Sequence, residues 1–159
     1  MSLISIFFLM LSLYFIILTS STIIRKFVTY KGLFYIFTSY LGGYLLYLMF
    51  IFTDVVLGNA TADFCWIFNT INWLSLDLTF SLKLDALSYF FVLLVTAIGV
   101  GTNFYILNYM KFEAQEDNFA LLINCFMLSM IILVLGNNLF TLFLGWESIG
   151  LSSFFLINF

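Results

Sequence analysis

Residues 142–153, with the sequence LFLGWESIGLSS, place an ionisable carboxyl group, Glu147, inside a run that otherwise carries no charge. The uncharged run extends from Leu139 to Phe159, and about 20 apolar residues are enough for a helix to cross a bilayer. A carboxylate in the middle of such a helix costs about 2.5–3.5 kcal/mol on insertion scales. The stretch therefore predicts a membrane helix, and the cost of a carboxylate in it indicates that Glu147 has a specific role.

The composition of the whole chain is that of an integral membrane protein. Hydrophobic residues make up 64% of its 159 residues and charged residues 8%, whereas soluble domains carry about 25% charged residues. The net charge of −3 is small and indicates no nucleic-acid partner. The chain has no histidine, which excludes histidine metal ligands and histidine acid–base chemistry within it. Cys65 and Cys125 lack a metal-binding spacing, and we expect two unpaired thiols.

Long apolar stretches predict an all-α integral membrane fold, with five transmembrane helices forming a single membrane domain. The predicted spans are residues 3–24, 32–53, 86–108, 119–136 and 139–159, and residues 54–85 form a long external loop. Within this loop, apolar and polar residues alternate strictly from Leu74 to Asp85, which predicts a strand with one buried face. The segment Trp66–Trp73 is the expected partner strand of a short β-hairpin.

Basic residues decide the predicted orientation. Arg25, Lys26 and Lys31 lie in the loop after the first span, and the positive-inside rule places such a loop on the inner side of the membrane. The N-terminus and residues 54–85 are then expected outside, and the last span is expected to end inside.

The last predicted span has two distinct faces on a helical wheel drawn at about 100° per residue. One narrow stripe holds small residues, whose spacing lets another helix approach closely. Its members are Thr141, Gly145, Ser148 and Ser152. Glu147 lies about 120° from that stripe. It shares its own face with Phe140, Leu144, Leu151, Phe154 and Asn158.

Glu147 is the candidate functional residue because charged groups inside membrane spans usually mark proton or ion pathways. An apolar surrounding favours the neutral acid and a nearby cation favours the carboxylate, so a carboxyl in this position can act as a proton relay. The basic residues Arg25, Lys26, Lys31, Lys83 and Lys111 all flank predicted spans. Either the cationic partner lies on another polypeptide, or Glu147 stays protonated and joins helices by a hydrogen bond of about 1 kcal/mol. Lys83 and Asp85 are interpreted as a surface ion pair.

Residues 142–159, LFLGWESIGLSSFFLINF, resemble a signature helix of the NADH–ubiquinone oxidoreductase chain 5 family. This family is the distal antiporter-like subunit of respiratory complex I and is related to Mrp-type sodium/proton antiporters. Residues 83–88, KLDALS, and 105–110, YILNYM, also resemble motifs of the family, in the same order. The resemblance implies that Glu147 corresponds to the glutamate of the proton channel, which pairs with a lysine on a later broken helix.

The resemblance also implies a cellular setting. We expect the N-terminal part of a split chain 5 subunit, with a separate chain carrying the remainder and its membrane-embedded lysine. The other expected partners are the membrane subunits of complex I and lipids. The enzyme would be NADH:ubiquinone reductase in the mitochondrial inner membrane, and this chain would hold no cofactor or metal and perform no redox chemistry. Its N-terminus and residues 54–85 would face the intermembrane space, and its C-terminus the matrix.

Two other functions stay open at this point. A purely structural scaffold subunit would use Glu147 only to join helices, and a component of an Mrp-type antiporter would exchange cations for protons without an NADH dehydrogenase. The sequence Asn59-Ala60-Thr61 also matches a glycosylation sequon, and it would matter if the protein followed the secretory route.

Overall fold

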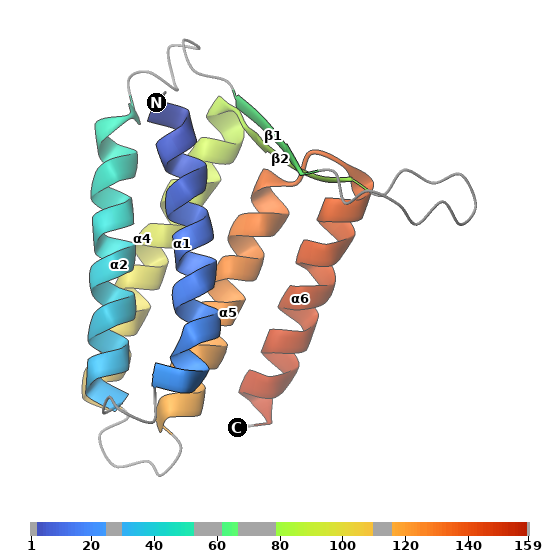
Figure 1. The fold of residues 1–159 in the computed structure, drawn as a ribbon. Helices are drawn as coiled ribbons and strands as arrows, with labels where there is room; N and C mark the ends of the chain where they lie inside the picture. Colours follow the sequence, from blue (N-terminus) through green and yellow to red (C-terminus); the bar gives the residue numbers. More distant parts are fainter. Residues whose placement is uncertain (1–2, 25–29, 53–61, 67–78, 110–115, 159) are drawn as a thin grey trace.

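The computed structural model describes residues 3–24, 30–52, 62–66, 79–109 and 116–158. These residues form five helices and two strands: α1 (Leu3–Ile24), α2 (Tyr30–Phe50), β1 (Ala62–Trp66), β2 (Phe80–Leu84), α4 (Ala86–Tyr109), α5 (Glu116–Leu135) and α6 (Leu139–Ile157). Successive helices alternate in direction, so that α1 begins and α6 ends at opposite ends of the bundle (Figure 1). The protein is mainly helical, in agreement with the sequence.

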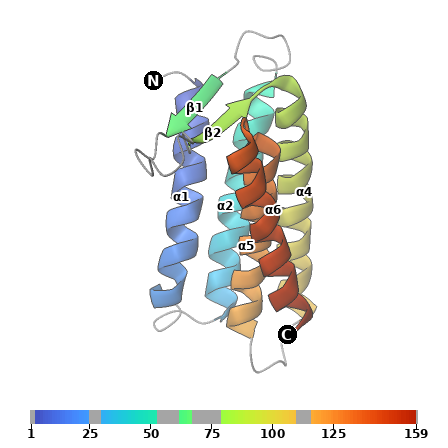
Figure 2. The ribbon, with the colours of Figure 1, turned by 90° about the vertical axis from the view of Figure 1, so that its right-hand side faces the viewer.

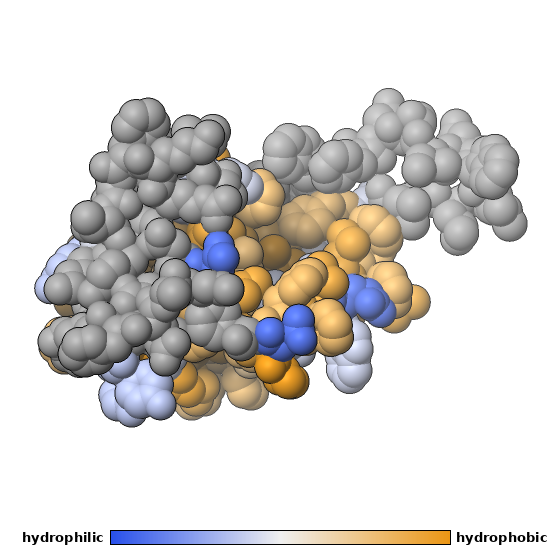
Figure 3. Space-filling model, turned by 90° about the horizontal axis from the view of Figure 1, so that it is seen from below, coloured by the Kyte–Doolittle hydropathy of each residue, from blue (hydrophilic) through white to orange (hydrophobic). Residues whose placement is uncertain are grey.

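Three of the described helices are long and apolar enough to cross a membrane. These stretches are Ala86–Ile106, Asn118–Leu135 and Leu139–Ile157, and they lie on the last three predicted spans. The two remaining helices, α1 and α2, contain shorter described apolar segments, Ile6–Ser21 and Tyr35–Phe50. Viewed from the end at which α6 finishes, the described surface is mostly hydrophobic, with few hydrophilic side chains (Figure 3). Large apolar side chains such as Phe15, Leu46 and Phe104 are exposed along the helices, so the lateral surface of the described bundle is suited to lipid or to other apolar helices.

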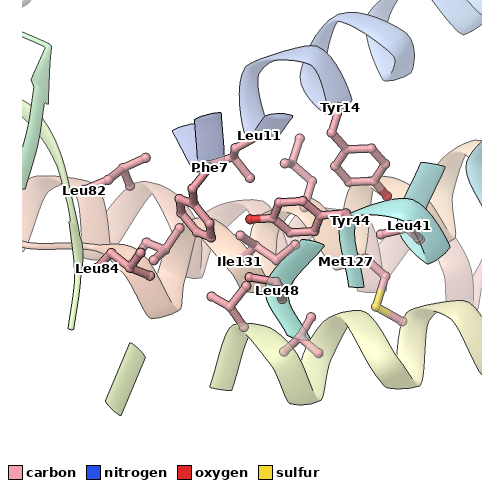
Figure 4. Close-up of a cluster of buried hydrophobic side chains, with 14 of the residues drawn as sticks. Phe7, Leu11, Tyr14, Leu41, Tyr44, Leu48, Leu82, Leu84, Met127 and Ile131 are labelled. Carbon is pink, nitrogen blue, oxygen red and sulfur yellow. The ribbon is translucent and has the colours of Figure 1, made fainter. Parts of the chain in front are cut away.

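One hydrophobic core joins four of the helices to strand β2. The side chains that point into it from α1, α2, α5 and β2 are shown in Figure 4 and include Phe7, Leu11, Leu41, Leu48, Ile131, Leu82 and Leu84. Tyr89, Val92 and Val95 of α4 are buried in the same cluster. The buried positions on each helix recur three or four residues apart, which is the spacing that places side chains on one helix face.

A two-stranded antiparallel sheet lies across one end of the bundle (Figures 1 and 2). In the sheet, Phe64 of β1 stands opposite Leu82 of β2. The alternation that predicted a strand is confirmed for Phe80–Leu84, and residues 67–78 lie outside the described part. Within the described residues, β2 pairs with Ala62–Trp66. Of the predicted partner segment Trp66–Trp73, Trp66 stands opposite Phe80, and residues 67–73 lie outside the described part. Most of β1 thus comes earlier in the chain than the predicted segment.

The second edge of β2 is held by the turn between α5 and α6. The backbone N–H of Ser81 donates to Thr141 Oγ1 at 3.1 Å, and the Ser81 carbonyl accepts from the Asn137 N–H at 3.1 Å. Leu82 also forms an isolated bridge with Gly136. The alternating pattern assigned Ser81 to the polar face, yet this residue is buried, because both of its backbone groups pair with the chain that leads into α6.

Asn138 fixes the start of α6. Its side chain accepts a hydrogen bond from the Thr141 N–H at 2.9 Å, as the N-cap residue of a helix does. Its amide nitrogen donates to Thr79 Oγ1 at 2.9 Å, and also to the Thr79 carbonyl. The Asn137-Asn138 turn is thus an anchor that joins α6 to the residues before β2.

A buried polar cluster, here called the Tyr14 cluster, consists of Tyr14, Asn103 and Asn124 and joins α1, α4 and α5. The Tyr14 hydroxyl donates to Asn124 Oδ1 at 2.9 Å, and Asn124 Nδ2 donates to Asn103 Oδ1 at 3.0 Å. The two amide groups also donate to carbonyls of their own helices, Asn103 to Gly99 at 2.9 Å and Asn124 to Ala120 at 2.8 Å. Because these side chains satisfy one another, they can be buried among apolar residues without a large desolvation cost.

Candidate functional site on the last helix

Glu147 lies in the middle of α6. It is the ninth of the 19 residues of the helix, counted from Leu139 to Ile157, so about 12 Å of helix separates it from the first residue. If α6 crosses a bilayer, this places the carboxyl close to the midplane. The helix itself stands at the edge of the bundle, beside α5 and away from α2 (Figures 1 and 2).

The inner face of α6 packs against α5 through small residues. Thr141, Gly145 and Ser152 are buried there, and they confirm most of the predicted stripe. A Cβ atom added to Gly145 would lie 2.8 Å from the backbone nitrogen and Cα of Leu133, so a side chain at this position would push the two helices apart. The predicted fourth member, Ser148, is exposed. It lies at the margin of the stripe, and its hydroxyl donates to the Leu144 carbonyl of its own helix at 2.7 Å.

The outer face of α6 carries Glu147, and this face is separate from the packing stripe, as the helical wheel predicts. Glu147 is exposed, and its neighbours on the same side are large and apolar. Leu144, Leu151 and Phe154 are all exposed as well. The neighbouring Trp146 leaves 70% of its surface uncovered. The carboxyl group thus sits in an apolar surface that faces away from the rest of the bundle.

In the part of the chain that the structure describes, Glu147 has neither a hydrogen-bond partner nor an ion-pair partner. The hydroxyl groups of α6 are engaged elsewhere, because Ser152 and Ser153 donate to carbonyls of their own helix. Lys83 lies in β2, at the end of the bundle where α6 begins. The other basic residues belong to segments whose side chains are not described. The local chain therefore leaves the acid free for a group from outside it.

Asp85, interpreted from the sequence as part of a surface ion pair with Lys83, also caps a helix. Asp85 precedes α4, and its Oδ1 accepts the Ser88 N–H at 2.8 Å, which makes it the N-cap of that helix. These hydrogen bonds, with a smaller attraction from Lys83, hold the pKa of the Asp85 carboxyl below its usual range. The residue is a structural cap at the start of a predicted span.

Two further features of the outer face did not stand out in the sequence. Trp146 presents its indole to the outside, and it lies at mid-helix rather than at a membrane interface. Gly150 is exposed, and a Cβ atom added to it would meet no atom of the described chain within 4 Å. The signal that could have singled out Gly150 is its place one turn after Glu147, because a glycine inside a helix lowers helix stability.

Comparisons with known proteins agree on one family. A family model described as the N-terminus of NADH–ubiquinone oxidoreductase (complex I) chain 5 matches residues 70–120. NADH–ubiquinone oxidoreductase chain 5 of Paramecium tetraurelia is 37% identical over 145 residues, which cover 87% of this chain and 24% of that relative. NADH-quinone oxidoreductase subunit L of Escherichia coli is 39% identical over 90 residues, which cover 55% of this chain and 15% of that relative.

A solved structure shows the same arrangement of helices. A chain in the structure of the Mrp complex from Dietzia sp. DQ12-45-1b superposes with a TM-score of 0.72 and 27% identity, over 95% of this chain and 16% of that chain. The present chain spans about a quarter of the length of the Paramecium relative, at 24%. The chain is therefore a relative of NADH–ubiquinone oxidoreductase chain 5, and its central residues match the model of that family's N-terminus.

Proposed function

We propose that this chain supplies a proton-relay carboxyl, Glu147, to an antiporter-like module of a proton-translocating NADH:ubiquinone oxidoreductase. The observation that carries the proposal is the position of this acid. It stands midway along an apolar helix, on a face turned away from the bundle, without a partner in the described part of the chain. Acids placed in this way are costly and usually belong to proton or ion pathways. The similarity to NADH–ubiquinone oxidoreductase chain 5 is the reason for naming this enzyme.

The proposed relay requires a cation that moves close to Glu147 and then away from it. In the proposed relay, a proton is exchanged at the carboxyl group of Glu147 as the cation approaches and withdraws. The cation we propose is a membrane-embedded lysine on a helix outside residues 1–159. In the split-subunit arrangement expected from the sequence, that helix belongs to a separate chain. Each proton moved against the membrane potential stores about 2.3 kcal/mol per 100 mV.

The membrane arrangement follows from the same proposal. All five described helices cross the mitochondrial inner membrane, and the β1–β2 sheet lies in the external loop on the side of the intermembrane space. The alternating helix directions support this, because they put the start of α1 and the sheet at one end and the finish of α6 at the other. The chain contributes to NADH oxidation through coupling alone and binds no redox cofactor or metal.

The test is the substitution Glu147→Gln in the assembled complex, with Ser148→Ala as a matched control on the same helix. Glutamine keeps the size and the hydrogen bonds of the acid but cannot ionise. We expect normal assembly, a loss of proton pumping per NADH oxidised, and partial recovery in Glu147→Asp. Unchanged pumping in a fully assembled Glu147→Gln complex would rule out the relay. Loss of assembly without a pumping defect in the remaining complex would instead identify a structural scaffold.

A second candidate function is a component of an Mrp-type cation/proton antiporter, favoured by the likeness to a chain of the Mrp complex structure. The two candidates differ in what drives transport. Purified complex in sealed vesicles should acidify one compartment when NADH and quinone are supplied. Sodium-dependent proton exchange without NADH, in a preparation that contains no NADH dehydrogenase subunits, would favour the antiporter instead.

A further inference from the structure

Helix α6 makes extensive contact with two elements of the described chain. Along its length it packs against α5, and at its start it contacts β2. The contact with α5 is made through the small residues Thr141, Gly145 and Ser152. Small side chains provide few ridges that interlock with a neighbouring helix. This contact therefore sets the separation of α5 and α6 more firmly than it sets the rotation of α6 about its own axis.

Hydrogen bonds at the start of α6 supply the second constraint. Thr141 is the third residue of the helix, counted from Leu139, and its Oγ1 accepts the backbone N–H of Ser81 in β2 at 3.1 Å. Asn138, just before the helix, donates from Nδ2 to Thr79 Oγ1 at 2.9 Å. The four residues Thr79, Ser81, Asn138 and Thr141 are here called the α6 anchor. Asn138 and Thr141 are about 60° apart around the helix, so the anchor holds the rotation of α6 as well as its position.

The hydrogen bond between Ser81 and Thr141 lies inside the protein. Thr141 is fully buried, and Ser81 is 4% exposed. A buried backbone N–H that loses its acceptor is costly, so Thr141 Oγ1 is held in place against β2. The buried Ser152 hydroxyl on the same helix face differs, because it donates to carbonyls of its own helix. Thr141 is thus a residue through which the rotation of α6 is fixed to another element.

The rotation of α6 decides where the carboxyl group of Glu147 lies. Glu147 follows Thr141 by six residues, which is about 9 Å along the axis and about 120° around it. The ends of helix side chains lie about 5–6 Å from the axis, so a rotation of about 20° displaces this carboxyl by about 2 Å. Direct proton transfer needs heavy atoms about 2.6–3.2 Å apart. A displacement of that size would therefore separate the carboxyl from the group with which it exchanges protons.

We propose that Thr141 is a positioning residue for Glu147. By accepting the Ser81 N–H, it holds α6 at the rotation in which the carboxyl group meets its proton-exchange partner. The inference rests on the proposed function, because it takes Glu147 as the relay. It also gives β2 a role in proton pumping, since the strand provides the fixed point against which α6 is aligned.

The first experiment removes the acceptor and keeps the shape of the side chain. Thr141→Val and Thr141→Ser are introduced into the complete complex, and hydrogen exchange is followed in a peptide that contains Ser81. In Thr141→Val we expect assembly, roughly tenfold faster exchange of the Ser81 amide after the loss of its hydrogen bond, and a several-fold loss of protons pumped per NADH. Thr141→Ser keeps the hydroxyl and should restore both. Unchanged exchange, or unchanged pumping despite faster exchange, would overturn the proposal.

Ser152→Ala is the matched control. It removes a buried hydroxyl from the same face of α6, but one that is bonded within its own helix. We expect unchanged exchange at Ser81 and unchanged pumping per NADH. A pumping loss as large as that of Thr141→Val would mean that any change in this packed face lowers pumping, and the positioning role would be wrong.

Asn138→Asp tests the other half of the α6 anchor and decides the question if Thr141→Val does not assemble. Aspartate keeps an oxygen that can cap the helix but has no amide donor for Thr79. We expect an assembled complex with a smaller loss of pumping per NADH than in Thr141→Val. Normal pumping in this variant, with Thr141→Val unable to assemble, would assign the anchor to folding alone and overturn the proposal.

A double-mutant cycle tests whether Thr141 acts through Glu147. Thr141→Val and Glu147→Asp are combined, because the shorter acid is expected to retain part of the pumping. Independent residues give fold-losses that multiply, whereas residues that act on one contact do not. We expect a combined loss that differs several-fold from the product of the single losses. Losses that multiply would show that Thr141 acts by another route.

The relay and the positioning role can be separated by their failures. Normal pumping in an assembled Glu147→Gln complex would overturn the relay, and with it the purpose assigned to Thr141. If Glu147→Gln abolishes pumping while an assembled Thr141→Val complex pumps normally, the relay stands and the positioning role alone is wrong.

Discussion

The Tyr14 cluster and the outer face of α6 both place polar side chains among apolar helices, but only the first pairs them within the described chain. Tyr14, Asn103 and Asn124 bond to one another across three helices. Glu147, on α6, has no such partner in the described region. A closed polar cluster holds a bundle together, whereas an open polar group on an outer face indicates a contact that lies beyond the bundle. The comparison separates the residues that build this structure from the residue that we propose as a proton relay.

The largest loss of stability is expected on the inner face of α6, where there is no space for a side chain at Gly145. Gly145→Ala places a Cβ atom against the Leu133 backbone, and overpacking of this kind costs about 1–3 kcal/mol or more. We expect a clear drop in the melting temperature of the solubilised complex and separation of α6 from α5. Gly43→Ala is the matched control and should leave melting unchanged. An equal melting temperature for both variants would mean that α6 and α5 are not in close contact.

The next largest loss of stability is expected in the Tyr14 cluster. Asn124→Leu removes the side-chain partner of both Tyr14 and Asn103 and leaves the buried Asn103 Oδ1 without its donor, and an unsatisfied buried group costs about 1–3 kcal/mol. Thermal melting should fall, whereas Ser129→Ala, which removes a hydroxyl bonded to its own helix, should have a small effect. An unchanged melting temperature in Asn124→Leu would show that the Tyr14 cluster contributes nothing to stability.

The smallest change in stability is expected from substituting two tyrosines, one on α1 and one on α2. The Tyr14 hydroxyl donates to Asn124, but the buried Tyr44 hydroxyl has no hydrogen-bond partner in the described region. Tyr14→Phe should therefore cost about 1 kcal/mol, while Tyr44→Phe should be neutral or slightly stabilising because it removes an unsatisfied group. Melting temperatures of the two variants measured side by side test this, and a larger loss for Tyr44→Phe would reverse the assignment.

Much of the helical structure could be predicted from sequence because uncharged apolar stretches leave the backbone few alternatives in a membrane. The separation of Glu147 from the Thr141–Gly145–Ser152 stripe also followed from helical spacing alone. The pairing of β2 with Ala62–Trp66 was not predicted, because strand pairing is set by tertiary contacts. The exposure of Ser148 was missed because the wheel gives the direction of a residue but not the width of the packed face.

The Tyr14 cluster could not be predicted from the sequence for a related reason. Asn103 and Asn124 were visible as polar residues in apolar stretches, but Tyr14 and Asn124 are 110 positions apart in the chain. Periodicity shows which face of a helix is packed and does not show which helix it meets. The partner of Glu147 is a similar case, since nothing in the described residues supplies it.

The attachment of β2 to the turn before α6 has a consequence for the order of events during synthesis. Ser81 and Thr141 are 60 residues apart, so β2 leaves the ribosome well before the turn that completes it. Until residues 136–141 emerge, one edge of β2 has unpaired backbone groups, and such an edge can pair with other chains. The arrival of the turn closes that edge and seats the first residues of α6 in the same step. Nascent chains that stop short of it would present an open strand edge for recognition by chaperones and proteases.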